Sequence, residues 1–128
     1  MQPSFELDNY EIVSCSYRRN DVSGEVRGSI GFKQLIQRLE DNPDKYRVQI
    51  TTIVSGIADI ELVVAGYFTS TGLLDEDEVD SAIQFSGMYI LLPFIRSYIQ
   101  TVSCQDGRQP VTIPIINVGD LLSSNGDT

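Results

Sequence analysis

The sequence predicts an α+β fold, with four strands of an antiparallel sheet followed by one long C-terminal helix. Apolar and polar side chains alternate through much of residues 4–68, which is typical of strands with one buried face. From residue 79 to residue 102, apolar side chains recur at three- and four-residue steps, which indicates an amphipathic helix. A chain of 128 residues has the usual size of one domain.

The first strand is predicted over residues 4–13. Its apolar side chains change parity between Leu7 and Tyr10, and one extra residue exchanges the two faces of a strand. We therefore expect a bulge near Asn9. A polar stretch over residues 14–24 follows this strand.

The second strand is predicted over residues 26–32, where apolar residues alternate with polar or glycine positions. Three apolar residues at helical spacing come next. They predict a short helical turn over residues 33–40, and they are Leu35, Ile36 and Leu39.

The clearest strand signal is a hairpin over residues 46–68. Its even-numbered positions are mostly apolar on both sides of the central turn. This shared parity requires the numbers of paired residues to sum to an even number, as when Val54 lies opposite Ile60. The even side chains should form the buried face. The opposite face should be at least partly solvated, and it carries Arg47, Gln49, Asp59 and Glu61.

A helix is predicted over residues 77–103. The acidic run at residues 75–80 suits its start, because carboxylates are stabilised by the positive end of the helix dipole. This run lacks the glycine and the ligand spacing of a calcium-binding loop. Pro93 leaves the carbonyl group of Tyr89 without its helical donor, so a kink or break is expected. Asp106-Gly107 should end the helix.

The C-terminal part is predicted to be extended and then loose. Residues 110–118 are apolar and contain two prolines, so they should form an extended segment that lies against the protein. Residues 119–122 are expected to begin a helical turn. The predicted organisation is one domain over residues 1–122 and a flexible tail over residues 123–128.

The composition argues against several classes of function. The net charge is −9, and only two of the nine basic residues are adjacent, which disfavours nucleic acids and anionic membranes. The absence of histidine excludes His-dependent triads and imidazole-bound metals. Cys15 and Cys104 lack metal-site spacing and are expected to be reduced thiols. With no signal-peptide pattern and no membrane-length apolar run, we expect a cytoplasmic protein without membrane insertion.

Residues Leu91–Ile99 (Leu-Leu-Pro-Phe-Ile-Arg-Ser-Tyr-Ile) resemble a helix of the SecB family of protein-export chaperones. That helix has an apolar-Pro-aromatic-x-Arg core and is followed by a glycine-containing turn, an extended apolar segment and a short helix. Residues 106–108, 110–118 and 120–122 follow the same order. Residues 61–72 resemble the last strand of the family and its exit.

The resemblance implies a four-stranded antiparallel sheet packed with helices and assembled as a dimer of dimers, with no nucleotide or metal. SecB proteins bind unfolded preproteins in long hydrophobic grooves and pass them to the translocase motor SecA. Glu61 matches one position of the acidic surface that meets SecA. Ser14 and Arg18 occupy the first-strand positions where acids are expected, which argues against delivery to SecA.

The printed sequence also lacks the second amphipathic helix that helps to cover the groove in SecB proteins, so we expect looser capture of clients. SecB-like proteins also serve as chaperones dedicated to one partner, including toxin–antitoxin systems. The two departures fit that role. The partner is therefore expected to be either unfolded preproteins or one dedicated client protein.

Aromatic and apolar residues are the candidates for a client-binding groove, because they suit adaptable apolar recognition. Tyr67 lies opposite the predicted core face, whereas Phe68 and Phe94 fit the core better. Residues 111–116 are equally compatible with a groove wall and with core packing. The candidate client-binding residues are Tyr67, Leu92, Tyr98, Val111, Ile113 and Ile115.

Two other hypotheses remain open. A long helix against an antiparallel sheet also describes hot-dog thioesterases, in which the acids at residues 75–80 would lie near the catalytic position. A plain oligomeric scaffold is the third possibility. A homo-oligomer, either a dimer or a tetramer, is expected in any case because apolar residues lie off the main helical row, namely Phe85, Met88 and Leu92.

Overall fold

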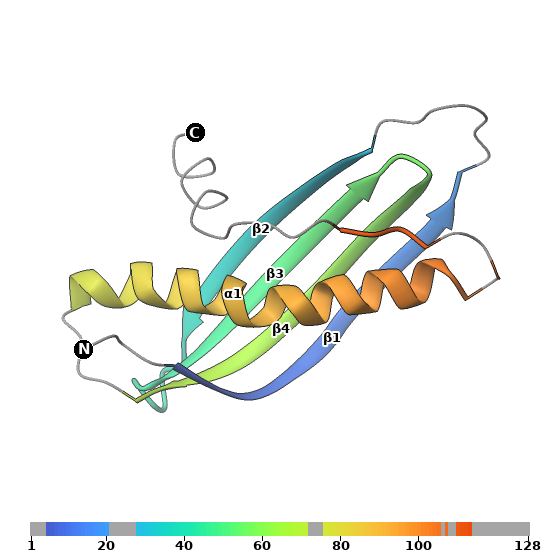
Figure 1. The fold of residues 1–128 in the computed structure, drawn as a ribbon. Coiled ribbons are helices and arrows are strands. Elements are labelled where there is room, and N and C mark those ends of the chain that lie inside the picture. The colour runs from blue at the N-terminus through green and yellow to red at the C-terminus, as the bar shows by residue number, and fades with distance from the viewer. Residues whose placement is uncertain (1–4, 21–27, 72–75, 106, 108–109, 114–128) are drawn as a thin grey trace.

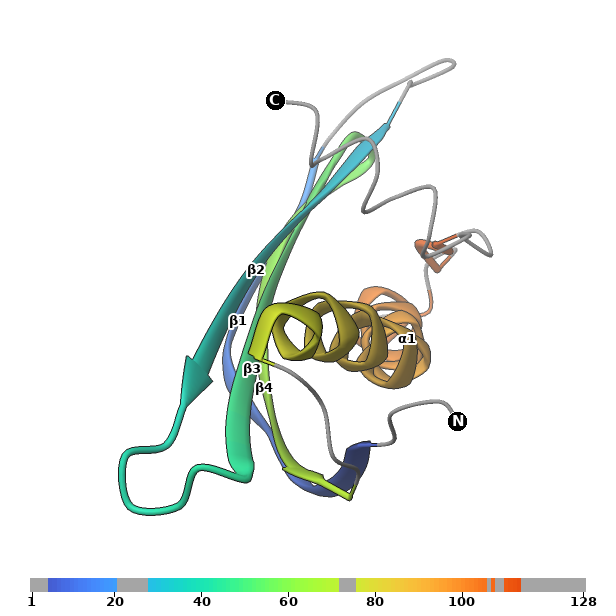
Figure 2. The same ribbon diagram turned by 90° about the vertical axis from the view of Figure 1, so that its left-hand side faces the viewer.

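The computed structural model describes residues 5–20, 28–71, 76–105, 107 and 110–113. Four strands precede one helix. They are β1 (Phe5–Arg19), β2 (Ser29–Arg38), β3 (Lys45–Ser55), β4 (Ala58–Ser70) and α1 (Glu76–Ser103). The strands form one antiparallel sheet in the order β1-β4-β3-β2. The helix crosses one face of this curved sheet (Figures 1 and 2). The α+β fold predicted from the sequence is confirmed.

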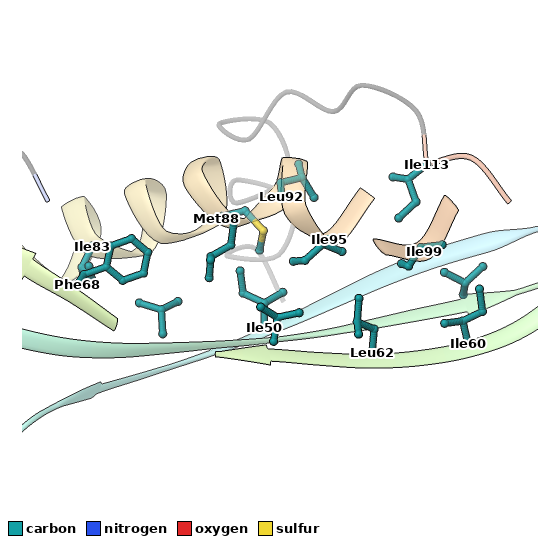
Figure 3. Close-up of a cluster of buried hydrophobic side chains, with 14 of the residues drawn as sticks. Ile50, Ile60, Leu62, Phe68, Ile83, Met88, Leu92, Ile95, Ile99 and Ile113 are labelled. Carbon is teal, nitrogen blue, oxygen red and sulfur yellow. The ribbon is translucent and has the colours of Figure 1, made fainter. Parts of the chain in front are cut away.

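The core lies between α1 and the even-numbered residues of the β3–β4 hairpin. Ile50, Leu62 and Val64 are almost fully buried, and the predicted pairing of Val54 with Ile60 is present. The helix contributes Ile83, Met88, Leu91, Ile95 and Ile99 to the same cluster (Figure 3). Each fully buried side chain of this kind contributes about 1.5–3 kcal/mol to folding. The opposite, odd-numbered face of the hairpin is partly solvated, as predicted.

Two glycines allow the helix to approach the sheet closely. A Cβ atom added at Gly66 of β4 would lie 3.0 Å from the side chain of Leu91 on the helix. A Cβ atom added at Gly87 would lie 2.9 Å from Cγ1 of Val48 on β3. The absence of side chains at these two positions therefore sets the spacing between the two layers.

β1 is longer than predicted and runs to Arg19 rather than to residue 13. The predicted bulge near Asn9 is present as a register shift between Leu7 and Asn9, and a second shift follows between Ile12 and Ser14. The second shift restores alternation in a segment that contains mainly polar residues. The predicted end of the strand at residue 13 was wrong, because a strand with one solvated face tolerates polar residues.

β2 continues through the region where a helical turn was predicted, so the prediction for residues 33–40 was wrong. Leu35 and Ile36 lie in a strand and point to opposite faces of the sheet. Leu35 is 52% exposed on the outer face of the sheet, whereas Ile36 packs against the core on the helix side. Two adjacent apolar residues are thus divided between the two faces of an edge strand.

The helix agrees closely with its predicted bounds, because it begins one residue earlier and ends at the predicted residue. Pro93 lies inside it without breaking it. Gly107 has a positive φ of 80°, and its N–H group donates to the carbonyl of Cys104 (3.1 Å). The predicted turn at residues 119–122 and the tail at residues 123–128 lie outside the described residues, as does Asp106.

The extended segment after the helix is described over residues 110–113, where no helix or strand is present. Val111 and Ile113 are buried. The N–H group of Val111 donates to Oγ of Ser103 (2.7 Å), which fastens this segment to the last turn of α1. Residues 114–118 of the predicted segment lie outside the described residues.

Candidate polypeptide-binding site

An apolar groove lies where the start of β2, the β3–β4 turn and the extended segment meet. Its volume is about 420 Å³. No charged residue contributes to the part of its wall that the structure describes. The lining residues are Gly28, Ser29, Ile30, Val54, Ser55, Ile57, Pro110, Val111 and Thr112. Such a surface suits an apolar side chain with a few hydrogen bonds from the neighbouring backbone.

A second, more polar groove of about 560 Å³ lies at the other end of β2, beside the first turns of α1. Nη2 of Arg38 donates to the hydroxyl of Tyr46 (2.7 Å), and Nε2 of Gln34 donates to the carbonyl of Gln84 (3.0 Å). Oε1 of Gln34 is buried and has no hydrogen-bond partner among the described residues. Ile36 and Asp80 complete the lining.

The two grooves lie on the same face of the same strand. Ile30 lines the apolar groove and Ile36 lines the polar groove, and both alternate onto the helix side of β2. The six residue steps from Ile30 to Ile36 correspond to about 20 Å along an extended chain. This separation matches the length of a short extended polypeptide segment.

The candidate client-binding residues from the sequence are distributed over different parts of the molecule. Val111 lines the apolar groove, whereas Leu92 and Ile113 are buried in the core and lie farther from the sheet than Ile95 (Figure 3). Tyr98 is half-buried against the same core. Ile115 lies outside the described residues.

Tyr67 lies on the opposite face of the sheet from both grooves. Its hydroxyl donates to Oε1 of Glu11 (3.0 Å) and accepts from Nε of Arg47 (3.3 Å). These contacts place Tyr67 in a polar network on the outer face. Glu61 is exposed on the same face, where its neighbours on adjacent strands are Ser16 and Ile53.

The surface around Glu61 has mixed charge. Nη2 of Arg18 lies 2.7 Å from Oδ2 of Asp59, two residues along β4 from Glu61. Hydrogen bonds from Arg18 and Asn20 lower the pKa of Asp59 below its usual value. The docking acid proposed from the sequence is therefore accompanied by a cation.

Sequence reasoning missed the main walls of the apolar groove. Ile30 and Val54 are directly paired across β2 and β3, and Ile57 follows in the turn. These residues are far apart in sequence or sit in a short turn, so only the correct strand pairing brings them together. The alternation of Ile30, Phe32 and Ile36 was the signal that would have extended β2 and revealed one of these walls.

Two exposed aromatic residues, Phe85 and Tyr89, form an apolar surface on α1. The rings of Phe85 and Tyr89 are stacked with centroids 5.9 Å apart, and Phe94 contacts Tyr10 of β1 at 4.6 Å. Met88 and Leu92, which the sequence suggested as interface residues, are buried instead. No helix in the described part of the chain is long and apolar enough to cross a membrane.

Several solved structures resemble this arrangement. The *Mycobacterium tuberculosis* Rv1957 SecB-like chaperone, in complex with a ChAD peptide from the Rv1956 HigA1 antitoxin, matches with a TM-score of 0.73. The match has 15% sequence identity and covers 88% of this chain and 90% of that chain. This chain has the SecB-like fold.

A second solved structure also matches, whereas the sequence comparisons find no match. A protein of unknown function from *Streptococcus agalactiae* matches with a TM-score of 0.57 and 13% identity, over 90% of this chain and 100% of that chain. No protein-family model matches the sequence, and no curated protein sequence matches it. At these identities, the likeness shows the fold alone.

Proposed function

We propose that this protein is a chaperone or adaptor that binds extended or unfolded polypeptide segments beside β2 without ATP. The observation that carries this proposal is the open apolar groove of about 420 Å³ on a SecB-like fold. Its described walls contain four branched apolar residues and no charge, which suits the side chains of an unfolded chain. The neighbouring polar groove adds hydrogen-bonding groups that suit a peptide backbone.

A dedicated client fits the proposal better than a wide range of exported proteins. Leu92 and Ile113 were candidates for a long groove, but both are buried within the chain itself. The two grooves beside β2 together match only about 20 Å of extended chain. A short site of this kind favours one matched segment, and the complex of the Rv1957 chaperone with an antitoxin peptide is consistent with such a role.

General export chaperoning is the second candidate, with unfolded preproteins as clients and SecA as the receiving partner. Exposed Glu61 favours it. The ion pair between Arg18 and Asp59 beside Glu61 argues against delivery to SecA, because this part of the outer face is not uniformly acidic. We therefore propose one dedicated client protein, rather than a range of exported preproteins, as the partner.

The proposal does not include catalysis. Glu78 and Asp80 are the acids near the helix start whose side chains the structure describes, and both are exposed. Exposed carboxylates at this position are accounted for by the helix dipole. A thioesterase of the hot-dog type would instead be revealed by hydrolysis of acyl-CoA substrates.

Suppression of aggregation is the test of the proposed function. We expect a fewfold molar excess of the protein to lower the light scattering of chemically denatured citrate synthase on dilution, without ATP. A general chaperone would lower it fully, and a dedicated adaptor would do so weakly while binding one cellular protein in a fixed ratio. If neither suppression nor a stoichiometric polypeptide partner is found, the proposed function is wrong.

A further inference from the structure

The two edges of the sheet differ in a way that bears on ligand binding. β1 and β2 are the edge strands, and among the described residues each is paired on one side only. β1 contains two register shifts, whereas β2 pairs with β3 without any shift from Ser29 to Arg38. Bulges protect an edge against the addition of another strand. The regular edge of β2 lacks that protection.

Two hydrogen bonds show which residues of β2 turn their backbone groups to the open side. The N–H group of Leu39 donates to the carbonyl of Lys45 (3.0 Å), so Leu39 faces β3. The N–H group of Ser70 donates to the carbonyl of Asp44 (2.8 Å), so Asp44 faces β4. Adjacent residues of a strand turn their backbone groups to opposite sides, which agrees with Lys45 facing β2. The odd-numbered residues of β2 therefore face β3. The even-numbered residues face the open edge, and they include Ile30, Phe32, Gln34 and Ile36.

The same even-numbered residues direct their side chains to the helix side, where both grooves lie. Within the described part of the chain, each of these residues thus combines a backbone N–H and carbonyl that face no strand with a side chain at or between the grooves. A strand added beside β2 would bond these backbone groups. Its own side chains on the helix side would reach the apolar groove near Ile30 and the polar groove near Ile36.

The charge of this half of the sheet indicates the chemistry of the added strand. β2 and β3 carry Lys33, Arg38, Lys45 and Arg47 and no Asp or Glu, although the whole chain has a net charge of −9. Lys33 is exposed on the outer face in the middle of β2. A carboxylate on the outer face of an added strand would therefore be attracted to Lys33.

We infer that β2 accepts an extended segment of the client polypeptide as a fifth strand of the sheet. The segment spans about seven residues, because it reaches from Ile30 to Ile36 at about 3.3 Å per residue. Its side chains are apolar on the face toward α1, and at least one is acidic on the other face. This inference rests on the proposed function and specifies its binding mode. Backbone pairing of this kind is a common way to bind extended peptides.

Amide hydrogen exchange measured by NMR tests the inference directly. The probe is reduced, carboxymethylated ribonuclease A, which stays unfolded in native buffer. We expect the amides of Ile30, Phe32, Gln34 and Ile36 to exchange rapidly in the free protein and at least about tenfold more slowly at saturation with the probe. Gly31, Lys33 and Leu35, which face β3, should show no comparable change. An added strand predicts this alternating pattern, whereas side-chain contacts alone do not.

A proline variant provides a second measurement. Ile36→Pro removes one open-edge N–H group and leaves the odd-numbered bonds to β3 in place, which an edge strand tolerates. We expect its affinity for the probe to fall about tenfold, because about one hydrogen bond is lost. Ile36→Val keeps the N–H group and should therefore bind the probe more tightly than Ile36→Pro does. If Ile36→Pro does not fold, the exchange pattern of the unchanged protein alone decides whether a strand is added beside β2.

Three outcomes would overturn the inference. The first is binding of the probe without alternating protection along β2. The second is protection of the even-numbered amides before the probe is added, which would mean that another part of this chain or a second copy occupies the edge. The third is equal affinity of folded Ile36→Pro and Ile36→Val. Each of these results, obtained with suppression of aggregation intact, rejects the added strand and leaves the proposed function standing.

Discussion

Ser103 joins three parts of the molecule at the end of the helix. Its side chain is fully buried. Its carbonyl accepts hydrogen bonds from the side chains of Tyr17 (3.4 Å) and Arg19 (3.0 Å) on β1, and its Oγ accepts one from the N–H group of Val111. A single residue thus connects α1, the sheet and the segment that forms one wall of the apolar groove.

We predict that Ser103→Ala lowers both stability and client affinity. The variant leaves the N–H group of Val111 buried without its acceptor, which costs about 1–3 kcal/mol. Ser97→Ala, on the exposed side of the same helix, is the matched control and should change the free energy of unfolding by less than about 0.5 kcal/mol. Urea unfolding measures both variants. Equal stabilities would show that the bond to Val111 is unimportant.

Burial of Cys15 on the helix side of β1 raises the pKa of its thiol. A raised pKa keeps the thiol protonated near neutral pH, where it is a weak nucleophile. Neither cysteine is paired with another in the described structure, in agreement with the expectation of free thiols.

At the scale of the elements, the sequence predicted the hairpin and the helix well because each has one unbroken period. β3 and β4 alternate on even numbers, and α1 keeps its three- and four-residue steps through Pro93. β1 was predicted only in part. After the bulge between Ile12 and Ser14 the strand continues through mainly polar residues, which give no clear apolar alternation. In β2, the adjacent apolar residues Leu35 and Ile36 imitated helical spacing.

The candidate site was less predictable than the fold. Val111 was anticipated as a groove residue, and the structure places it in a groove wall. Leu92 and Ile113 are covered by packing that depends on the whole chain, and no local pattern reveals such burial. Ile30 and Val54 reach the groove through strand pairing, which becomes evident only when β2 is assigned correctly.

We predict that Pro93→Ala leaves the fold intact and alters assembly more than it alters the core. The exposed proline interrupts the hydrogen bonding of the Tyr89 carbonyl, so alanine should raise the free energy of unfolding by up to about 3 kcal/mol. The restored bond would also change the local course of the helix between Tyr89 and Phe94, which are both exposed aromatics. Thermal unfolding and light scattering test this. Outright unfolding of the variant would contradict it.

At the scale of the whole molecule, the exposed aromatic surface of α1 supports a homo-oligomer. Tyr89 is 63% exposed and stacks with Phe85, in a protein whose other large aromatics on the helix side are mostly covered. Exposed apolar surface of this kind marks an interface. Because this surface and the grooves beside β2 involve different residues, assembly and client binding should be separable.

We predict that the unchanged protein has at least twice the mass of the 14.2 kDa monomer at micromolar concentration. Tyr89→Ser should shift this mass toward the monomer. Leu35→Ser removes another exposed apolar side chain, on the outer face of β2, and should leave the mass unchanged. Multi-angle light scattering distinguishes these results. If the protein without substitutions has the mass of a monomer, the aromatic surface has another role.

Two matched variants test whether polypeptide binds in the grooves beside β2. Ile57 lies on the rim of the apolar groove and is 37% exposed, whereas Ile53 is 36% exposed on the opposite face of the sheet. Each is changed to aspartate, and the affinity for fluorescently labelled, reduced, carboxymethylated ribonuclease A is measured by fluorescence anisotropy. A charge placed in an apolar binding surface should cost at least about tenfold in affinity. We expect this loss for Ile57→Asp and a change of less than about twofold for Ile53→Asp. Equal affinities of the two variants, or a larger loss for Ile53→Asp, would contradict binding in these grooves.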